Sequence, residues 1–141
     1  MAAVVVVLLP LLLVIAVWFT LWRLGLLFSV WIFWCAKGRI ALFVYSDSPN
    51  WKEYIETNIL SRFDNRVVIL NWSNRSKWKT SLAKLVFQHW GGRREFNPLG
   101  VVFKPFHRTR VFRFHEPFMD FKHGKSENLK KLEAEFFAKL G

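Results

Sequence analysis

The first quarter of the chain is an almost unbroken apolar run. From Ala2 to Trp34 it carries one charge, Arg23. Its uninterrupted part, residues 2–22, has the length of a helix that crosses a ~30 Å hydrocarbon layer. No Lys or Arg precedes the run, and the run is longer than the core of a secretory signal peptide. We therefore expect a retained anchor with a single span. Residues 24–35 could continue this helix or lie in the membrane interface.

Aromatic and basic residues mark the boundary of the expected span. Amphipathic rings collect at the membrane–water interface, and positively charged flanks stay cytoplasmic. Because Arg23, Lys37 and Arg39 follow the span, we expect the N-terminus outside and the rest of the chain in the cytoplasm. The residues expected at the interface are Trp18, Trp22, Arg23, Trp31 and Trp34.

Two other features bear on this orientation. Asn71-Trp-Ser and Asn74-Arg-Ser are glycosylation sequons, which would matter only if the domain were lumenal. Cys35 is the chain's one cysteine, so it has no partner for an intrachain disulfide. The cysteine usage agrees with a reducing compartment.

Beyond Lys37, short apolar runs alternate with segments whose apolar residues recur at helical spacing. The nearly continuous run at 40–45 is typical of a strand covered on both faces. In chain order, the pattern predicts strands at 40–45, 66–72, 99–103 and 110–115, and helices at 49–63, 78–90 and 127–140. This order predicts an α/β domain over residues 37–141, after a transmembrane and interfacial segment at 1–36.

The connections predict a mixed four-stranded sheet. Helical segments join the first three strands, so we expect these strands to be parallel. The link at 107–109 is short, which favours an antiparallel pairing of the last two strands, since a parallel pair needs a longer crossover.

The formal net charge of +11 belongs almost entirely to the part after the span. Basic residues near anionic headgroups are attracted to them, so the lipid bilayer is one expected partner. The basic residues are scattered and form no RNA- or DNA-binding signature. Nucleic acid is therefore not expected as a partner.

Two local positions fit the strand order. Asp47-Ser48-Pro49-Asn50 follows the first strand, and Asn97-Pro98 precedes the third. With them, residues 39–140 resemble the thioredoxin-like fold superfamily. The resemblance implies that residues 47–50 stand where the family has Cys-x-x-Cys, and that Pro98 corresponds to the family's cis proline. Since thiol–disulfide exchange requires a thiolate, it also implies a redox-inactive domain. X-Pro bonds are cis in only about 5–6% of cases, so both isomers remain open.

The loop after the first strand offers the first candidate site. Asp47, Ser48 and Asn50 are expected to cap the next helix. Alternatively, these residues and Pro98 could bind a small anionic or glutathione-like ligand at the helix N-terminus.

Other catalytic and metal-binding patterns are missing from the sequence. No Gly-x-Ser-x-Gly elbow and no phosphate-binding glycine motif is present. The four histidines are spaced without a close ligand pair, so neither a metal nor a cofactor is expected. They are His89, His107, His115 and His123.

The last two strands and the residues after them combine aromatic and basic side chains. Phenylalanines recur here at 103, 106, 112, 114, 118 and 121. Aromatic residues and Arg are enriched at protein–protein contacts, whereas simple alternation would bury one face and solvate the other. The candidate interaction surface consists of Lys104, Phe106, Arg108, Arg110 and Arg113.

These observations together favour a non-catalytic, membrane-anchored accessory or assembly subunit that docks on a larger membrane protein complex. One alternative is an enzyme or binding protein that uses the 47–50 loop. The other is a membrane-surface module that recognises anionic lipid.

Overall fold

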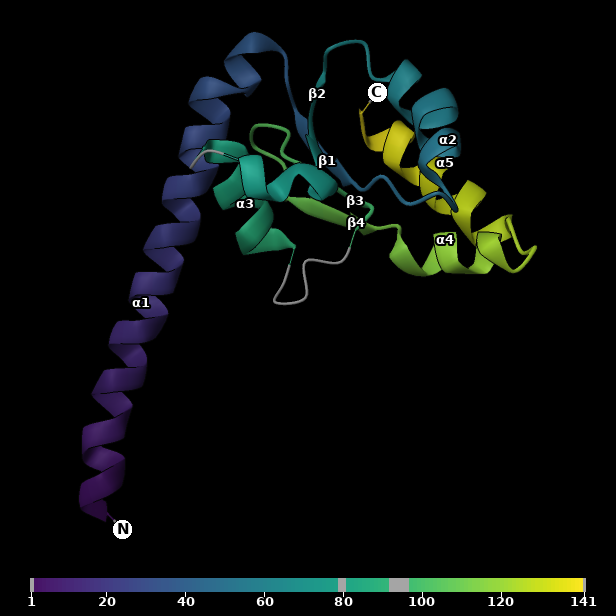
Figure 1. The fold of residues 1–141 in the computed structure, drawn as a ribbon. Helices are drawn as coiled ribbons and strands as arrows, with labels where there is room; N and C mark the ends of the chain where they lie inside the picture. Colours follow the sequence, from purple (N-terminus) through teal and green to yellow (C-terminus); the bar gives the residue numbers. More distant parts are fainter. Residues whose placement is uncertain (1, 79–80, 92–96, 141) are drawn as a thin grey trace.

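A computed structural model describes residues 2–78, 81–91 and 97–140 (Figure 1). One long helix, α1 (Ala2–Phe33), extends away from an α/β domain formed by the rest of the chain. The other helices and strands are β1 (Ala41–Tyr45), α2 (Lys52–Tyr54), β2 (Val67–Asn71), α3 (Leu82–Trp90), β3 (Leu99–Val102), β4 (Arg110–Arg113), α4 (His115–Lys122) and α5 (Glu127–Leu140), with short 3-10 or π-helical turns at Cys35–Lys37, Ile55–Ile59, Leu60–Arg62 and Trp72–Lys77.

The four strands form one mixed sheet in the order β2-β1-β3-β4. β1 and β2 are parallel, with Tyr45 opposite Asn71. β3 is antiparallel to β1, with Leu99 opposite Val44, and β4 is antiparallel to β3. The α/β class and the mixed four-stranded sheet are therefore confirmed.

The prediction that the first three strands are parallel is wrong for the third. β2 ends at Asn71 and β3 begins at Leu99, and both residues lie beside the C-terminal end of β1. The connection therefore leaves and re-enters the sheet at the same end of the strands. A helical connection makes the next strand parallel only when it carries the chain back to the opposite end of the strands. α3 has nine residues, about 14 Å of helix. The chain then re-enters the sheet at the end of the strands where β2 finished.

Alternate residues of β1 contribute to two hydrophobic cores, one on each face of the sheet. All five residues of β1 are buried, as predicted for a strand covered on both faces. Ala41, Phe43 and Tyr45 belong to the first core, together with residues of α4 and α5. Leu42 and Val44 belong to the second core, which α3 and the end of α1 cover.

The helix predicted at 49–63 is irregular. The three residues of α2 are followed by a π-helical turn and then a 3-10 turn. Its apolar residues still fall on one buried side, because Trp51, Ile55, Ile59 and Phe63 all belong to the first core. The apolar spacing therefore predicted the buried side correctly, although the hydrogen bonding is not that of a regular α-helix.

α4 has no counterpart among the predicted helices. Its N-cap residue, Phe114, makes no side-chain capping hydrogen bond, so the usual polar start signal is missing. Pro117 lies in the first turn, where the missing N–H removes no intrahelical hydrogen bond. Phe118 is completely buried in the first core, which holds this short helix against the sheet.

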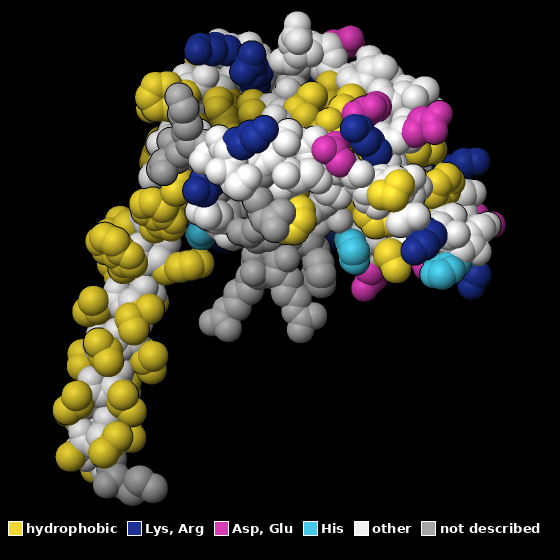
Figure 2. Space-filling view, in the orientation of Figure 1, with side chains coloured by type: hydrophobic (Ala, Val, Ile, Leu, Met, Phe, Trp, Pro, Cys, Tyr) yellow, Lys and Arg dark blue, Asp and Glu magenta, His cyan; other side chains and the backbone are white. Residues whose placement is uncertain are grey.

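α1 continues without a break through residues 24–33, so these residues extend the first helix. Figure 2 shows hydrophobic side chains along the protruding part of this helix. Within the described residues, it is the one helix long and apolar enough to cross a membrane, by length and composition. Its last turns behave differently, because Leu26 and Val30 are buried in the second core of the domain.

Candidate functional site

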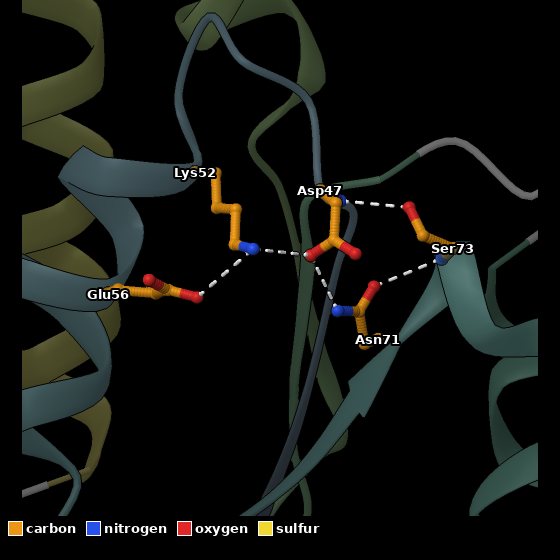
Figure 3. Close-up of polar contacts among 5 residues, drawn as sticks. All are labelled: Asp47, Lys52, Glu56, Asn71 and Ser73. Carbon is orange, nitrogen blue, oxygen red and sulfur yellow. Dashed lines mark hydrogen bonds and ion pairs between the residues drawn. The ribbon is translucent and has the colours of Figure 1, made fainter.

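The loop that follows β1 is fixed by a polar network (Figure 3). Asp47 Oδ1 accepts a hydrogen bond from Asn71 Nδ2 at 2.8 Å and lies 3.3 Å from Lys52 Nζ. The backbone N–H of Asp47 donates to Ser73 Oγ at 2.9 Å. Lys52 Nζ also lies 3.9 Å from Glu56 Oε1. The network therefore links the ends of β1 and β2 to the start of α2.

These contacts shift the titration of the two charged groups. The hydrogen bond from Asn71, followed by that from Lys52, lowers the pKa of the Asp47 carboxyl. The hydrogen bond to Asp47 is the main cause that raises the pKa of Lys52. Both groups are held in their charged forms, which suits a structural ion pair better than an acid or base that must exchange protons near neutral pH.

Capping of the first turn differs from the expectation. The carbonyl oxygen of Ser48 accepts hydrogen bonds from the backbone N–H groups of Trp51 and Lys52, at 3.3 and 2.9 Å. Trp51 occupies the N-cap position and makes no side-chain capping bond. The expected side-chain caps are thus replaced by a backbone carbonyl, and Asn50 is exposed to solvent.

Pro98 lies at the same end of the sheet as this loop, because it directly precedes Leu99, which is opposite Val44. The Asn97–Pro98 peptide bond is cis, and Pro98 is buried at the start of β3. It lines a cleft of about 570 Å³, here called the mixed cleft, with Arg113 and His115. No residue of the 47–50 loop is among its described lining residues. Of the four ligand candidates, Pro98 alone is among the described residues that line this cleft.

The mixed cleft carries both charge signs. Arg113 and Lys131 line it together with Glu116, Asp120 and Glu135, and His115 Nδ1 lies 3.2 Å from the Asn97 carbonyl oxygen. Among the described lining residues, none offers a hydroxyl or thiol nucleophile. The chemically active groups of its described lining are therefore carboxylates, an amine, a guanidinium and an imidazole.

A second cleft, here called the basic cleft, has a more uniform character. It measures about 600 Å³ and lies between the β3–β4 hairpin and the end of α5. Lys104, Arg108, Arg110 and Lys139 line it, and within the described part of the chain no carboxylate does so. Glu135 is nearby, with its Oε2 4.0 Å from Arg110 Nη2.

Three residues of the predicted interaction surface thus meet in the basic cleft: Lys104, Arg108 and Arg110. Arg113 does not join them, because it lies at the other end of β4 and lines the mixed cleft. Lys139 was missed, since an exposed lysine in the last turn of a helix carries no signal of its position in space. Only the packing of α5 across the sheet brings it to the hairpin.

Phe106 is at the tip of the hairpin and is 94% exposed. The N–H of His107 donates to the Lys104 carbonyl at 3.1 Å, which closes a four-residue turn with Pro105 second and Phe106 third. Phe106 has a φ of 63°, a left-handed conformation that favours glycine or asparagine at this turn position. An exposed phenylalanine therefore occupies a position whose backbone disfavours it.

The other phenylalanines of this region are not part of a contact surface. Phe103 is buried in the second core, whereas Phe112, Phe114 and Phe118 are buried in the first. Phe121 is partly buried against the first core. The aromatic richness of this stretch thus reflects mainly the two cores, and Phe106 is the exception.

The expected interfacial residues divide into two groups. Trp18, Trp22 and Arg23 are exposed on α1. Trp34 is only 8% exposed and packs into the domain, with its ring 6.2 Å from that of Phe103. Trp31 is partly buried against the second core. These last two indoles hold the end of α1 against the domain, because both pack in or against the second core.

α1 and α3 also contact each other nearer the middle of α1, at Phe19. The imidazole of His89 lies against the ring of Phe19, with 5.1 Å between centroids. Burial, and to a smaller extent the nearby Arg23, lowers the pKa of His89. A neutral imidazole is the form that suits this contact with an apolar helix.

A buried carboxylate links α5 to the helical segment after β1. Glu133 is 8% exposed, accepts a hydrogen bond from the Tyr54 hydroxyl at 2.6 Å, and lies 3.2 Å from Arg62 Nη1. Glu133 lies four residues after Leu129 and three before Phe136, so it shares the buried side of α5 with these two residues. Its partners show a structural role in joining two helical segments.

No group of three or more His, Cys, Asp or Glu side chains in the described residues is placed to hold a metal ion.

Comparisons with protein-family models, curated proteins and solved structures found no match for this chain.

Proposed function

We propose that this chain is a non-catalytic, membrane-anchored accessory subunit that docks on a larger membrane protein complex. α1 spans the bilayer, and the α/β domain presents a docking surface beside it. The observation that carries this proposal is the burial of Leu26 and Val30, from the last turns of α1, in the core of the domain. A helix shared in this way holds the domain in a fixed position relative to the span.

The dimensions of α1 suit this arrangement. Residues 2–22 of the helix are about 31 Å long at 1.5 Å per residue, which matches a ~30 Å hydrocarbon layer. The contact between Phe19 and His89 lies just before the end of that segment. The domain would therefore rest directly on the membrane surface, with no flexible linker between them.

The domain itself is proposed to be thioredoxin-like and redox-inactive. Two observations support this: the chain order of its strands and main helices, and the cis Asn97–Pro98 bond directly before β3. α4 is an addition to the order expected from the resemblance. The loop in the position of the redox pair contains Asp47, whose carboxylate is bound to Asn71 and Lys52 instead of taking part in exchange chemistry.

The proposed orientation places the domain in the cytoplasm, on the basis of Arg23, Lys37 and Arg39 after the span. The Asn74 sequon provides a test in a glycosylating host. A cytoplasmic domain predicts an unglycosylated chain, whereas a glycan that is lost on Asn74→Gln would place the domain in the lumen.

Fixed positioning of the domain can be tested by changing its height. Seven alanines inserted directly after Arg23 would raise the domain by about 10.5 Å while turning it only slightly. The matched control has the same seven alanines inserted after Ala3, at the far end of the helix. The readout is the fraction of each chain that enters a high-mass assembly in a mild detergent. The proposal predicts a loss for the insertion after Arg23 alone, and equal assembly of both variants would contradict it.

A further inference from the structure

We propose that the basic cleft, with Phe106 beside it, binds an acidic peptide segment of the partner protein. This inference rests on the proposed docking function and adds the chemistry of the partner. It follows from three observations: the charge of the cleft, the conformation of Phe106, and the position of both relative to the span.

The charge of the cleft favours an anionic ligand. Lys104, Arg108, Arg110 and Lys139 come from three different elements and line one hollow of about 600 Å³. Cations gathered in a cleft repel one another, and the low-dielectric walls focus their field toward the opening. A segment with several carboxylates would relieve this repulsion and make charge-assisted hydrogen bonds with both arginines. The buried side chain of Val102 and the methyl group of Ala138 add apolar contact inside the cleft.

Phe106 adds a hydrophobic contact at the rim. It lies between Lys104 and His107, both of which line the cleft. Its ring is 94% exposed, although it lies 5.7 Å from the ring of Trp31. Glycine would adopt the φ of 63° without steric cost. A large aromatic ring that the fold neither buries nor favours is well suited to contact another molecule, since exposed aromatic anchors dominate many protein interfaces.

The position of the cleft favours a protein over the chain's own bilayer. Trp31, which contacts Phe106, lies eight residues beyond Arg23, about 12 Å farther along α1. The headgroup layer extends only about 5–7 Å beyond the hydrocarbon, and exposed charges are screened over ~8 Å at physiological ionic strength. In Figure 1 the β3–β4 loop and the C-terminal end of α5 lie on the side of the domain away from the N-terminus of α1. Residues of these two segments line the cleft, so the proposed partner reaches it beyond the headgroup layer.

The test uses the full chain in nanodiscs of phosphatidylcholine. The probe is a short fluorescein-labelled peptide of Glu, Asp and Leu, and a peptide with Lys in place of the acids is its control. Lys104→Glu with Arg108→Glu changes two cations of the cleft and leaves the Arg110–Glu135 contact in place. Lys125→Glu with Lys130→Glu makes the same change in net charge at exposed positions outside the cleft.

Fluorescence anisotropy should show that the cleft variant binds the acidic peptide at least about tenfold more weakly, whereas the control variant binds within about twofold of wild type. Phe106→Gly should also weaken binding while the melting temperature stays the same or rises. That combination separates a contact role from a structural one.

Three outcomes would overturn the proposal. The first is no binding of the acidic peptide by the wild-type chain. The second is equal weakening in both double variants, which would show a response to net charge and not to the cleft. The third is binding of added phosphatidylserine vesicles through Lys104 and Arg108 with no peptide binding, which would make the cleft a lipid site. A wild-type chain that enters a large assembly in any of these cases would keep the docking function and remove only the acidic partner.

Discussion

The imidazole of His89 lies against the ring of Phe19, with 5.1 Å between their centroids. This contact joins the end of α3 to the apolar helix one turn before Arg23. Farther along, the same helix enters the second core through Leu26 and Val30. Helix α1 and the domain therefore form one packed body.

Loss of a side chain at this shared core should destabilise the whole domain. Leu26 is 4% exposed, and Leu26→Ala should reduce the free energy of unfolding by about 2–5 kcal/mol, because it removes buried methyl groups and leaves a cavity. Urea unfolding in detergent, followed by tryptophan fluorescence, measures the change. Leu24→Ala is the matched control, since Leu24 is 45% exposed on the same helix. Equal effects of the two substitutions would show that α1 does not pack as described.

A close contact between α5 and β3 gives a second test. A Cβ added at Gly100 would lie 2.7 Å from Phe136 Cε2, so glycine allows this ring to pack on the strand backbone. Gly100→Ala should cost about 1–3 kcal/mol through overpacking. Gly25→Ala, where nothing lies within 4 Å of the new Cβ, should not destabilise the chain. A neutral Gly100→Ala in the same unfolding assay would contradict the contact.

The Asp47 network predicts a specific dependence of stability on acid pH. Its contacts with Asn71 and Lys52 lower the pKa of Asp47 below the ordinary value of 3.8. The folded state therefore binds this proton less readily than the unfolded state does. The stabilisation is present above pH 3.8 and is lost as the pH falls through the lower folded-state pKa. Asp47→Asn should remove this part of the acid dependence of the unfolding midpoint, whereas Glu53→Gln on the neighbouring turn should retain it. An unchanged acid profile in Asp47→Asn would argue against the network.

The Tyr54–Glu133 hydrogen bond predicts an alkaline titration. Burial is the main cause that raises the pKa of Tyr54 to about 12, and the hydrogen bond with Glu133 adds to it. Because the folded state holds this proton more tightly, the stabilisation is full below pH 10 and is lost as the pH rises toward 12. The chain has two tyrosines, so Tyr45→Phe leaves phenolate absorbance that reports Tyr54 alone. A titration midpoint near 10 would show that the hydroxyl is not bound as described.

Much of the fold could be predicted from apolar spacing. The run at 40–45 predicted a strand buried on both faces, and all five residues of β1 are buried. Apolar residues at intervals of four predicted the buried side of the helical segment after β1, which is irregular in the structure. These residues are Trp51, Ile55, Ile59 and Phe63. Such patterns reflect the repeat of a helix or strand and the side of it that is buried, and both can be recognised in a single sequence.

What could not be predicted depends on how distant elements pack. The direction of β3 depends on the end of the strands at which the chain re-enters the sheet after α3. Residue spacing does not determine that choice. Lys104 and Arg108 were recognised as surface residues, but their cleft needs Lys139 from α5 to complete it. Trp34 was expected at the membrane interface as an amphipathic ring, but it is buried in the second core, where the end of α1 packs against the domain.

The docking role is tested most directly by the native molecular mass of the wild-type chain, extracted from its own membrane in a mild detergent, with identification of the proteins that co-migrate. An accessory subunit should run inside a large, defined assembly that contains other membrane proteins. A chain that runs alone, at the mass of a monomer or dimer in its detergent micelle, would rule out the proposed docking role.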